Sequence, residues 1–204
     1  MPSLVRATAR TLKQQATTIG GSVTAVWAGF AAQMATNNAV LAYGIHPRTK
    51  QGLWGILFAP FLHGSTEHLI ANTVPLIVLG WLVMLRDSKH FVPVTLLSML
   101  GAGLCAWTFG APGSVHIGAS GVVFGYLGFL MLAGWYARSL GAIALSVLVT
   151  ALWGSVVLGV LPGQPGISWQ AHLGGFLGGE CLADGGDNLL RRLRAREREP
   201  AVED

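Results

Sequence analysis

The amino-acid sequence predicts an all-α, polytopic membrane protein with six transmembrane helices. Of its 204 residues, 52% are hydrophobic and only 11% are charged, which is about half the charged fraction of a soluble domain. No Lys, Arg, Asp or Glu occurs between Lys13 and Arg48, between Lys89 and Arg138, or between Arg138 and Glu180. A soluble core does not require such uncharged stretches, whereas a bilayer-spanning helix requires about 20 apolar residues.

The apolar segments divide the chain into a membrane domain and two flanking arms. We expect spans at about 21–43, 68–85, 91–109, 118–137, 140–161 and 168–183. The membrane domain is then 21–183, between a basic arm at 1–20 and a charged tail at 184–204. The first span follows basic residues, as a secretory signal would. Its length and the lack of a small-residue cleavage site predict that it is retained.

Basic residues mark every second connection between the spans. The N-terminal arm, the 86–90 turn, Arg138 and the tail carry 11 of the 13 Lys and Arg residues, and the alternate loops hold only Arg48 and Lys50. The positive-inside rule therefore predicts a multi-pass protein of the cell membrane with both termini in the cytoplasm. The net charge of +4 then concerns topology and the lipid bilayer, and no basic-aromatic pattern suggests a nucleic-acid partner.

The first loop contains a second apolar stretch, Gly-Leu-Trp-Gly-Ile-Leu-Phe-Ala-Pro-Phe at 52–61. This stretch is too short to cross a bilayer and too apolar for water, which predicts an interfacial or re-entrant segment. The second span follows it and opens with His68 and Asn72, which share one helix face because they are four residues apart. They could form an interhelical hydrogen bond or serve a functional site. His63, which precedes them, is expected to be a loop histidine at the membrane interface.

The fourth span opens with a serine between glycines, in the stretch His-Ile-Gly-Ala-Ser-Gly-Val-Val-Phe-Gly at 116–125. Small residues allow membrane helices to approach closely, so Ser120 could be one more packing residue. It could also be a nucleophile, with the missing side chains leaving room for a substrate backbone. His116 is either a second candidate base or a solvated loop histidine.

The sixth span begins with His172, which heads a face of glycines. Gly175 and Gly179 on this span have the same four-residue spacing as Gly121 and Gly125 on the fourth span. Matched small faces predict that the two helices press together. A bulky residue at Gly134, which lies deeper in the fourth span, is expected to cost less activity and stability than one at Gly175.

The predicted topology places the polar residues in one shallow layer. Spans two, four and six all run inward, so His68, Ser120 and His172 lie within about 10 Å of the outer interface and Asn72 lies one turn deeper. A neutral imidazole can activate a serine hydroxyl, which makes His172 the candidate base. No carboxylate is expected at this depth, so the sequence predicts a dyad instead of a triad. Phe124 lies one turn after Ser120 and would orient the imidazole by packing against it.

The oxyanion of a serine-protease intermediate needs hydrogen-bond donors. The candidates are the backbone N–H of Ser120 at its helix N-terminus, the Asn72 amide and the His68 ring. The two cysteines, Cys105 and Cys181, are expected at opposite ends of the bilayer, too far apart for a disulfide.

Three motifs, in order and together with six spans, resemble the rhomboid intramembrane serine proteases. They are Gly118-Ala-Ser120-Gly121, His68 with Asn72, and Ala171-His172 followed by Gly175 and Gly179. The resemblance covers nearly all of residues 21–183. It implies cleavage of single-span membrane proteins near their outer membrane boundary, often after a small residue where the substrate helix is weak. It further implies a Ser120–His172 dyad, substrate or oxyanion contacts at His68, Asn72 and Gly118, and no metal or other cofactor.

The resemblance also implies a lateral gate near spans two and five, and a cap from the loop after span five. One departure concerns the first loop, where the family often carries Trp-Arg. Here Trp54 is followed by Gly55, which puts the anchoring of that loop in question.

Two other classes of protein are open to test. A catalytically dead rhomboid-like binding protein would have lost the serine or the histidine, and both are present. A transporter or a zinc-dependent membrane protease would need a charged cavity or metal ligands. No His-Glu-x-x-His occurs, and the histidines lack carboxylate or thiolate neighbours in the sequence. Nothing in the sequence names the substrate, the cleavage motif or the oligomeric state.

Overall fold

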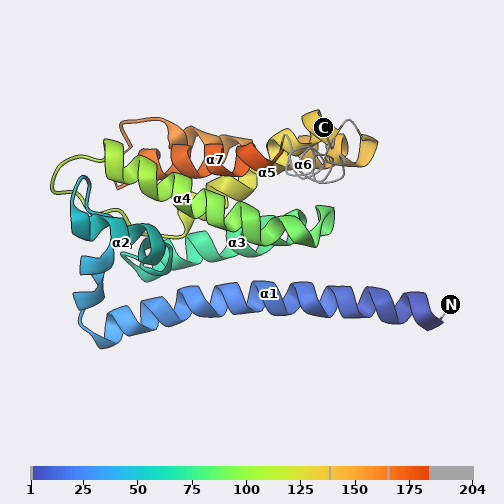
Figure 1. Cartoon of the computed structure of the whole chain (residues 1–204), viewed down its shortest axis with the longest axis horizontal. Coiled ribbons are helices and arrows are strands. Elements are labelled where there is room, and N and C mark those ends of the chain that lie inside the picture. Colours follow the sequence, from blue (N-terminus) through green and yellow to red (C-terminus); the bar gives the residue numbers. More distant parts are fainter. Residues whose placement is uncertain (1, 138, 165, 184–204) are drawn as a thin grey trace, which may run out of the picture.

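The computed structural model describes residues 2–137, 139–164 and 166–183 as a bundle of helices (Figure 1). The longer helices are α1 (Pro2–Ala35), α3 (Thr66–Arg86), α4 (Phe91–Phe109), α5 (Ser120–Ala137), α6 (Leu140–Trp153) and α7 (Trp169–Ala183). The shorter ones are α2 (Lys50–Phe58) and the 3₁₀ helices η1 (Ala39–Tyr43), η2 (Ala59–Phe61), η3 (Ser88–His90) and η4 (Gly154–Val160). No strand occurs in these residues, which confirms the all-α prediction for them.

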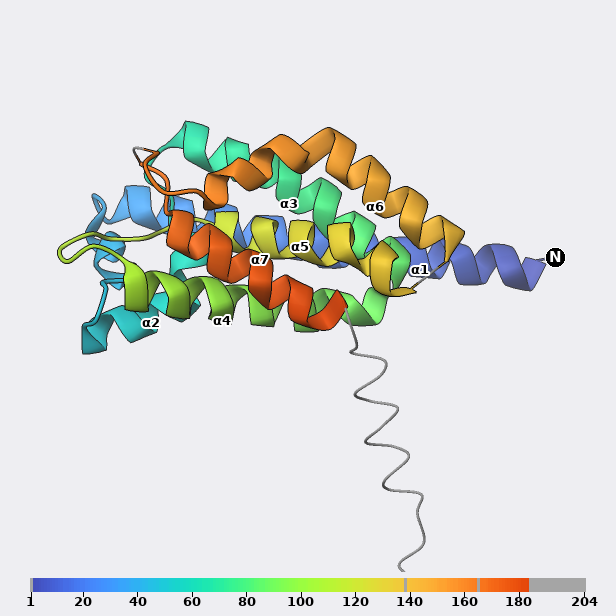
Figure 2. The same cartoon turned by 90° about the horizontal axis from the view of Figure 1, so that it is seen from above.

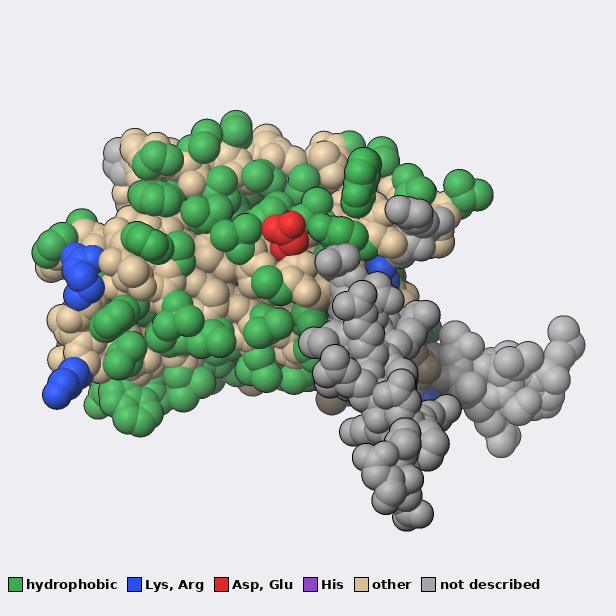
Figure 3. All heavy atoms as spheres, turned by 45° about the horizontal axis from the view of Figure 1, so that its top comes forward, with side chains coloured by type: hydrophobic (Ala, Val, Ile, Leu, Met, Phe, Trp, Pro, Cys, Tyr) green, Lys and Arg blue, Asp and Glu red, His purple; other side chains and the backbone are tan. Residues whose placement is uncertain are grey.

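Among the described residues, three helical stretches are long and apolar enough to cross a membrane by length and composition. They are Thr66–Arg86, Ser88–Phe109 and Leu140–Val160, and Ser120–Tyr136 is a shorter apolar helix. Large apolar side chains are exposed along the outside of the bundle, and Figure 3 shows them spread over one face of it. An exposed apolar surface of this extent suits lipid instead of water. The count of six spans stays a prediction.

The N-terminal helix differs from the predicted division at residue 20. Helix α1 runs without a break from Pro2 to Ala35, because no proline interrupts it after its first turn. It ends where Asn37 (φ 48) and Asn38 (φ 67) adopt left-handed backbone conformations, which short polar side chains tolerate better than most. The division into an arm and a membrane domain stays a prediction, and the predicted tail at 184–204 lies outside the described residues.

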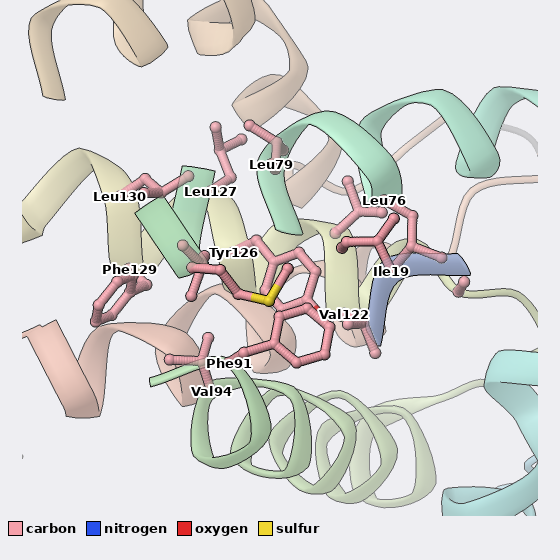
Figure 4. Close-up of a cluster of buried hydrophobic side chains, with 14 of the residues drawn as sticks. Ile19, Leu76, Leu79, Phe91, Val94, Val122, Tyr126, Leu127, Phe129 and Leu130 are labelled. Atoms are coloured by element: carbon pink, nitrogen blue, oxygen red, sulfur yellow. The ribbon is translucent and has the colours of Figure 1, made fainter. Parts of the chain in front are cut away.

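Helix α5 lies at the centre of the bundle, with α4 and α7 on one side and α3 and α6 on the other in Figure 2. The side chains of Tyr126, Leu127, Phe129 and Leu130 are at most 1% exposed. Figure 4 shows them meeting apolar side chains from several other helices in one core cluster. This buried central helix fixes the position of its first residue, Ser120.

The glycine face of α7 is used on two sides. A Cβ atom on Gly175 would collide with the carbonyl oxygen of Gly121, and one on Gly179 would collide with that of Gly125. The structure therefore brings together the two glycine faces that the sequence matched. The adjacent glycines of α7, Gly174 and Gly178, press in the same way against backbone carbonyls of α4, a contact that the sequence analysis missed.

The first loop is anchored by contacts that do not require an arginine after Trp54. Arg48 donates from its Nη1 to the carbonyl of Thr108 at 2.8 Å, and the Trp107 indole donates to the carbonyl of Thr49 at 2.8 Å. A Cβ on Gly55 would meet the backbone nitrogen of Ile45 at 2.5 Å, so a larger residue does not fit there. Trp54 is 65% exposed, which fits the prediction of an apolar interfacial segment.

Candidate active site

Ser120 is the first residue of α5. A turn at Gly118 precedes it. Gly118 has φ +114, a backbone conformation that residues other than glycine rarely adopt. Its N–H donates to the carbonyl of Ala59 at 2.8 Å, which ties the turn to η2. Ser120 therefore leaves the loop at the N-terminus of a helix, where the first N–H groups have no intrahelical acceptor.

His172 contacts Ser120 from the first turn of α7. Its Nε2 lies 2.9 Å from the Ser120 Oγ, and its Nδ1 lies 3.0 Å from the carbonyl oxygen of Gly159 in η4. A carbonyl oxygen can only accept a hydrogen bond, so Nδ1 must carry the proton of the neutral ring. Nε2 is then unprotonated and accepts the hydrogen bond of the serine hydroxyl, which is the arrangement that a general base requires.

Phe124 holds the imidazole plane. The two rings are stacked with centroids 4.0 Å apart and an interplanar angle of 11°. His172 is 8% exposed and Phe124 is 4% exposed, so the ring pair is almost closed to its surroundings. The orienting role that a carboxylate has in a triad is thus divided between a carbonyl and a phenyl ring.

His68 and Asn72 lie together against the turn that precedes Ser120. A Cβ on Gly118 would be 2.8 Å from the Nε2 of His68 and 3.4 Å from the Nδ2 of Asn72. The Asn72 side chain is 6% exposed, and its Nδ2 is buried without a hydrogen-bond partner. Because a buried donor without a partner is costly, this amide is a donor available to a group that would bind beside Gly118.

His63 is not the interfacial loop histidine that the sequence predicted. It is fully buried, and its Nε2 accepts the N–H of Ala119 at 3.4 Å, next to the serine. The Gln33 side chain from α1 bonds both backbone groups of His63, at 2.6 Å and 3.1 Å. Burial, followed by the nearby His68, lowers the pKa of His63 from 6.5 to about 4, so the ring is neutral at neutral pH.

His116 is not a solvated loop histidine, which was one of the two roles considered for it, since it is only 9% exposed. Its ring nitrogens share hydrogen bonds with Ser168 at 2.6 Å and with Ser114 at 2.9 Å. Its backbone pairs with Ile45 in an isolated bridge. Both ring nitrogens are thus engaged away from Ser120, and burial lowers the pKa of His116. This geometry makes it a connector of loops instead of a second base.

The sequence analysis missed two contributors to this site, for different reasons. Gly159 acts through its carbonyl oxygen, and backbone groups leave no mark in a sequence. The contact of His63 with the Ala119 N–H arises because η2 folds the loop back under the Ala119 peptide. In the sequence, the only signal for a role of His63 was that it lies five residues before His68.

Comparisons with known proteins match most of this chain. The sequence profile of the Rhomboid domain matches residues 50–185. An uncharacterized protein of Mycobacterium tuberculosis is 43% identical over 148 residues, which are 69% of this chain and 62% of the relative. An uncharacterized protein of Mycobacterium leprae has the same identity over 59% of its own length.

RHOMBOID-like protein 1 of Arabidopsis thaliana is 32% identical over 141 residues, 65% of this chain and 34% of that protein. The chain thus spans about three fifths of the length of the mycobacterial relatives that it matches. The profile covers the residues from α2 to the end of α7, which include His68, Ser120 and His172. The chain belongs to the rhomboid family.

Proposed function

We propose that this protein is an intramembrane serine endopeptidase that cleaves single-span membrane proteins near their outer membrane boundary. The observation that carries the proposal is the 2.9 Å hydrogen bond between Ser120 and an unprotonated His172 Nε2. Family membership supports a protease superfamily. The chemistry of this chain rests on the geometry of the site.

The reaction begins when the Ser120 Oγ attacks the carbonyl carbon of the scissile peptide bond. His172 Nε2 takes the hydroxyl proton in the same step. The resulting imidazolium donates that proton to the leaving amine, which departs with the C-terminal part of the substrate. His172 then removes a proton from water, which attacks the acyl ester. The imidazolium returns this proton to the Ser120 Oγ as the second product leaves.

The negative charge of the tetrahedral intermediate falls beside Gly118. Asn72 Nδ2 and the backbone N–H of Ser120 are the donors assigned to it, and the His68 ring is a third. Gly118 lacks a side chain, and a Cβ there would occupy the space between these groups. The absence of a side chain leaves room for the substrate carbonyl.

The substrate enters from the bilayer between α3 and α6. Of the three span candidates, the α6–η4 stretch is the least buried. In its most apolar part 11% of the residues are buried in the protein, compared with 39% for α3 and 33% for the η3–α4 stretch. Helix α6 packs on α5 and makes little contact with α3. An element held on one side only can move aside, which supports a lateral gate at this place.

The proposed orientation puts both termini in the cytoplasm and the active site at the outer face of the cell membrane. Helix α3 runs from His68 at the site to Arg86 at the opposite end, where Lys89 follows in η3. This charge placement agrees with the positive-inside rule. Lipid and the single-span substrate are the proposed partners.

Cleavage in vesicles tests the proposal. Purified protein is reconstituted with a panel of tagged single-span proteins that differ in the residues at their outer membrane boundary. We expect cleavage of substrates with small, helix-weakening residues there, in the presence of a metal chelator as well as without it. Chelator-sensitive cleavage, or cleavage by Ser120→Ala, would contradict the proposed chemistry. Binding without cleavage across the panel would favour a rhomboid-like binding protein.

A further inference from the structure

Helix α6 packs on the core cluster through Leu145, Val149 and Trp153. Two hydrogen-bonded contacts of different character add to this packing. Toward its inner end, the Ser146 hydroxyl donates to the carbonyl of Leu130 at 2.7 Å and accepts the N–H of Gly134 at 2.9 Å. Toward its outer end, the chain continues as η4, in which Val156 is 41% exposed and Leu158 is 59% exposed. In η4, Val157 packs against the core cluster, whereas its neighbours Val156 and Leu158 stay exposed.

Besides this packing, η4 contacts the ring pair of His172 and Phe124 through Gly159. The Gly159 carbonyl accepts the hydrogen bond of His172 Nδ1 at 3.0 Å. A Cβ on Gly159 would lie 2.9 Å from the Cζ of Phe124 and 3.1 Å from the Nδ1 of His172. Such distances are tighter than ordinary van der Waals contact, so only glycine allows the backbone of η4 to approach this closely.

The hydrogen bond also decides where the proton of His172 resides. With the carbonyl in place, the proton stays on Nδ1 and Nε2 is free to accept from Ser120. Without the carbonyl, Nδ1 loses its acceptor, and the Phe124 ring stacked on the imidazole face supplies none. The preference for this tautomer is then removed. In the other tautomer Nε2–H is a donor, and it cannot take the serine proton.

We propose that Gly159 is a positioning residue through which the gate helix switches the base on. This inference rests on the proposed protease function and goes one step beyond it. When the outer part of α6 moves aside to admit a substrate, the Gly159 carbonyl leaves His172 and the dyad loses its base. When η4 returns over the substrate, the carbonyl restores the Nδ1–H tautomer. Cleavage thus follows closure of η4, and an open gate is catalytically silent.

Two alanine variants of the same 3₁₀ helix test the coupling. Gly159→Ala pushes the backbone away from Phe124 and His172. Gly154→Ala is the matched control, because its added Cβ would meet only the Cγ2 of Thr150, at 3.6 Å. The first readout is the rate at which a small fluorophosphonate phosphonylates Ser120, which needs the dyad but no transmembrane substrate. The second is the ¹⁵N resonances of the histidine rings, which report the tautomer of His172.

We expect Gly159→Ala to slow phosphonylation by 10- to 100-fold, since a misplacement of ~1 Å can cost on the order of 10²-fold in rate. The loss should fall on kcat for substrate cleavage with KM little changed, and the Nδ1–H signals of His172 should weaken. The phosphonylation rate of Gly154→Ala should stay within about twofold of the wild-type rate, because this substitution does not displace the dyad. Equal rates for the two variants, or a slower Gly159→Ala with unchanged His172 signals, would overturn the inference.

A backbone ester covers the case in which Gly159→Ala does not fold. Replacing Val160 by its α-hydroxy acid turns the Gly159 carbonyl into an ester carbonyl, which is a weaker acceptor and adds no atom near Phe124. The same slowing and the same change in His172 signals are expected, and wild-type values for both would overturn the inference. If the wild-type protein is neither phosphonylated at Ser120 nor active on any substrate, the proposed function fails. If the wild type is phosphonylated and the variants match it, only the coupling fails.

Discussion

At the scale of single residues, the site combines side chains that a sequence can indicate with contacts that it cannot. Topology and helical spacing predicted that Ser120 and His172 begin two helices at the same depth, and their hydrogen bond is present at 2.9 Å. The stacking of Phe124 follows from its position one turn after Ser120. The burial of His63 and the approach of Gly159 were not predictable, because they depend on how a loop and a 3₁₀ segment fold back onto the bundle.

Ser120→Ala and His172→Ala should each abolish proteolysis and leave a folded, membrane-inserted protein. Each residue supplies a chemical step that no neighbour replaces, so the double variant should lose little more than either single one. Ser155→Ala, at an exposed serine of η4, is the control and should keep wild-type activity. Initial cleavage rates in vesicles and thermal unfolding check both parts. Substantial cleavage by His172→Ala would end its assignment as the base.

Asn72→Ala should weaken catalysis without weakening the fold. Loss of one oxyanion donor costs about 10²–10³ in kcat in a serine protease, and two other donors remain here, so we expect a loss at or below the lower end. The Nδ2 of Asn72 has no partner in the described structure, so its removal breaks no protein hydrogen bond. Steady-state kinetics and the unfolding midpoint are the measurements. Wild-type rates for Asn72→Ala and His68→Ala alike would return both residues to a packing role.

The buried His63 should make the protein less stable as the pH falls below about 6.5. The unfolded chain binds a proton with a pKa near 6.5, whereas burial holds the pKa of folded His63 at about 4. Between these values the unfolded state binds more protons, so acid favours unfolding, by about 1.4 kcal/mol per pH unit. The stabilisation is fully present above pH 6.5 and is lost as the pH falls toward 4.

The test compares the wild type with His63→Gln, whose side-chain oxygen can still accept the Ala119 N–H. Between pH 7 and pH 5 the free energy of unfolding of the wild type should fall by about 2 kcal/mol more than that of the variant. Parallel pH profiles would show that His63 titrates equally in both states.

At the scale of the elements, close helix packing was predictable where small residues recur, but only some of the packing partners were. The spacing of Gly175 and Gly179 pointed to α5, and the structure brings these faces together. The expectation that Gly134 matters less than Gly175 stays a prediction. A Cβ at Gly134 would meet the Ala142 carbonyl at 2.6 Å and collide with the Ser146 hydroxyl. That glycine serves the contact between α5 and α6, a contact that hydropathy does not reveal.

Gly175→Ala should lower activity and stability together. The added methyl group forces α7 away from the Gly121 carbonyl, and a shift of ~1 Å between the helices that carry the dyad can cost on the order of 10²-fold in rate. Gly20→Ala on α1 is the control, because nothing lies within 4 Å of its added Cβ. Cleavage rate and unfolding midpoint are measured for both. A Gly175→Ala protein that matches Gly20→Ala would remove the α5–α7 contact from the account.

At the scale of the whole molecule, the described bundle has an all-helical core around α5 and an apolar outer surface that suits a bilayer. Segregated charge and hydropathy predicted this class of fold, because both reflect the solvent that the chain meets. The same signals overestimated the end of the first span, since α1 stops at Ala35 and η1 follows as a separate turn. Local backbone preferences of Asn37 and Asn38 decide that boundary, and a hydropathy window averages over them.

The proposed orientation makes Ala111 and Lys89 accessible from opposite sides of the membrane. Both are exposed, Ala111 in the loop after α4 and Lys89 in η3. With Cys105 and Cys181 replaced by alanine, an impermeant thiol reagent should label Ala111→Cys on intact cells. Lys89→Cys should be labelled only after the cells are opened. The reverse pattern would place the active site at the cytoplasmic face.

The central claim is that His172 makes Ser120 a nucleophile at the outer end of the bundle. The most direct measurement is mass spectrometry of the protein after reaction with a fluorophosphonate in a lipid bilayer. The account predicts a single adduct on Ser120 in the wild type, and its loss in His172→Ala while His116→Ala keeps it. An adduct on another residue, or equal modification of Ser120 in wild type and His172→Ala, would contradict it.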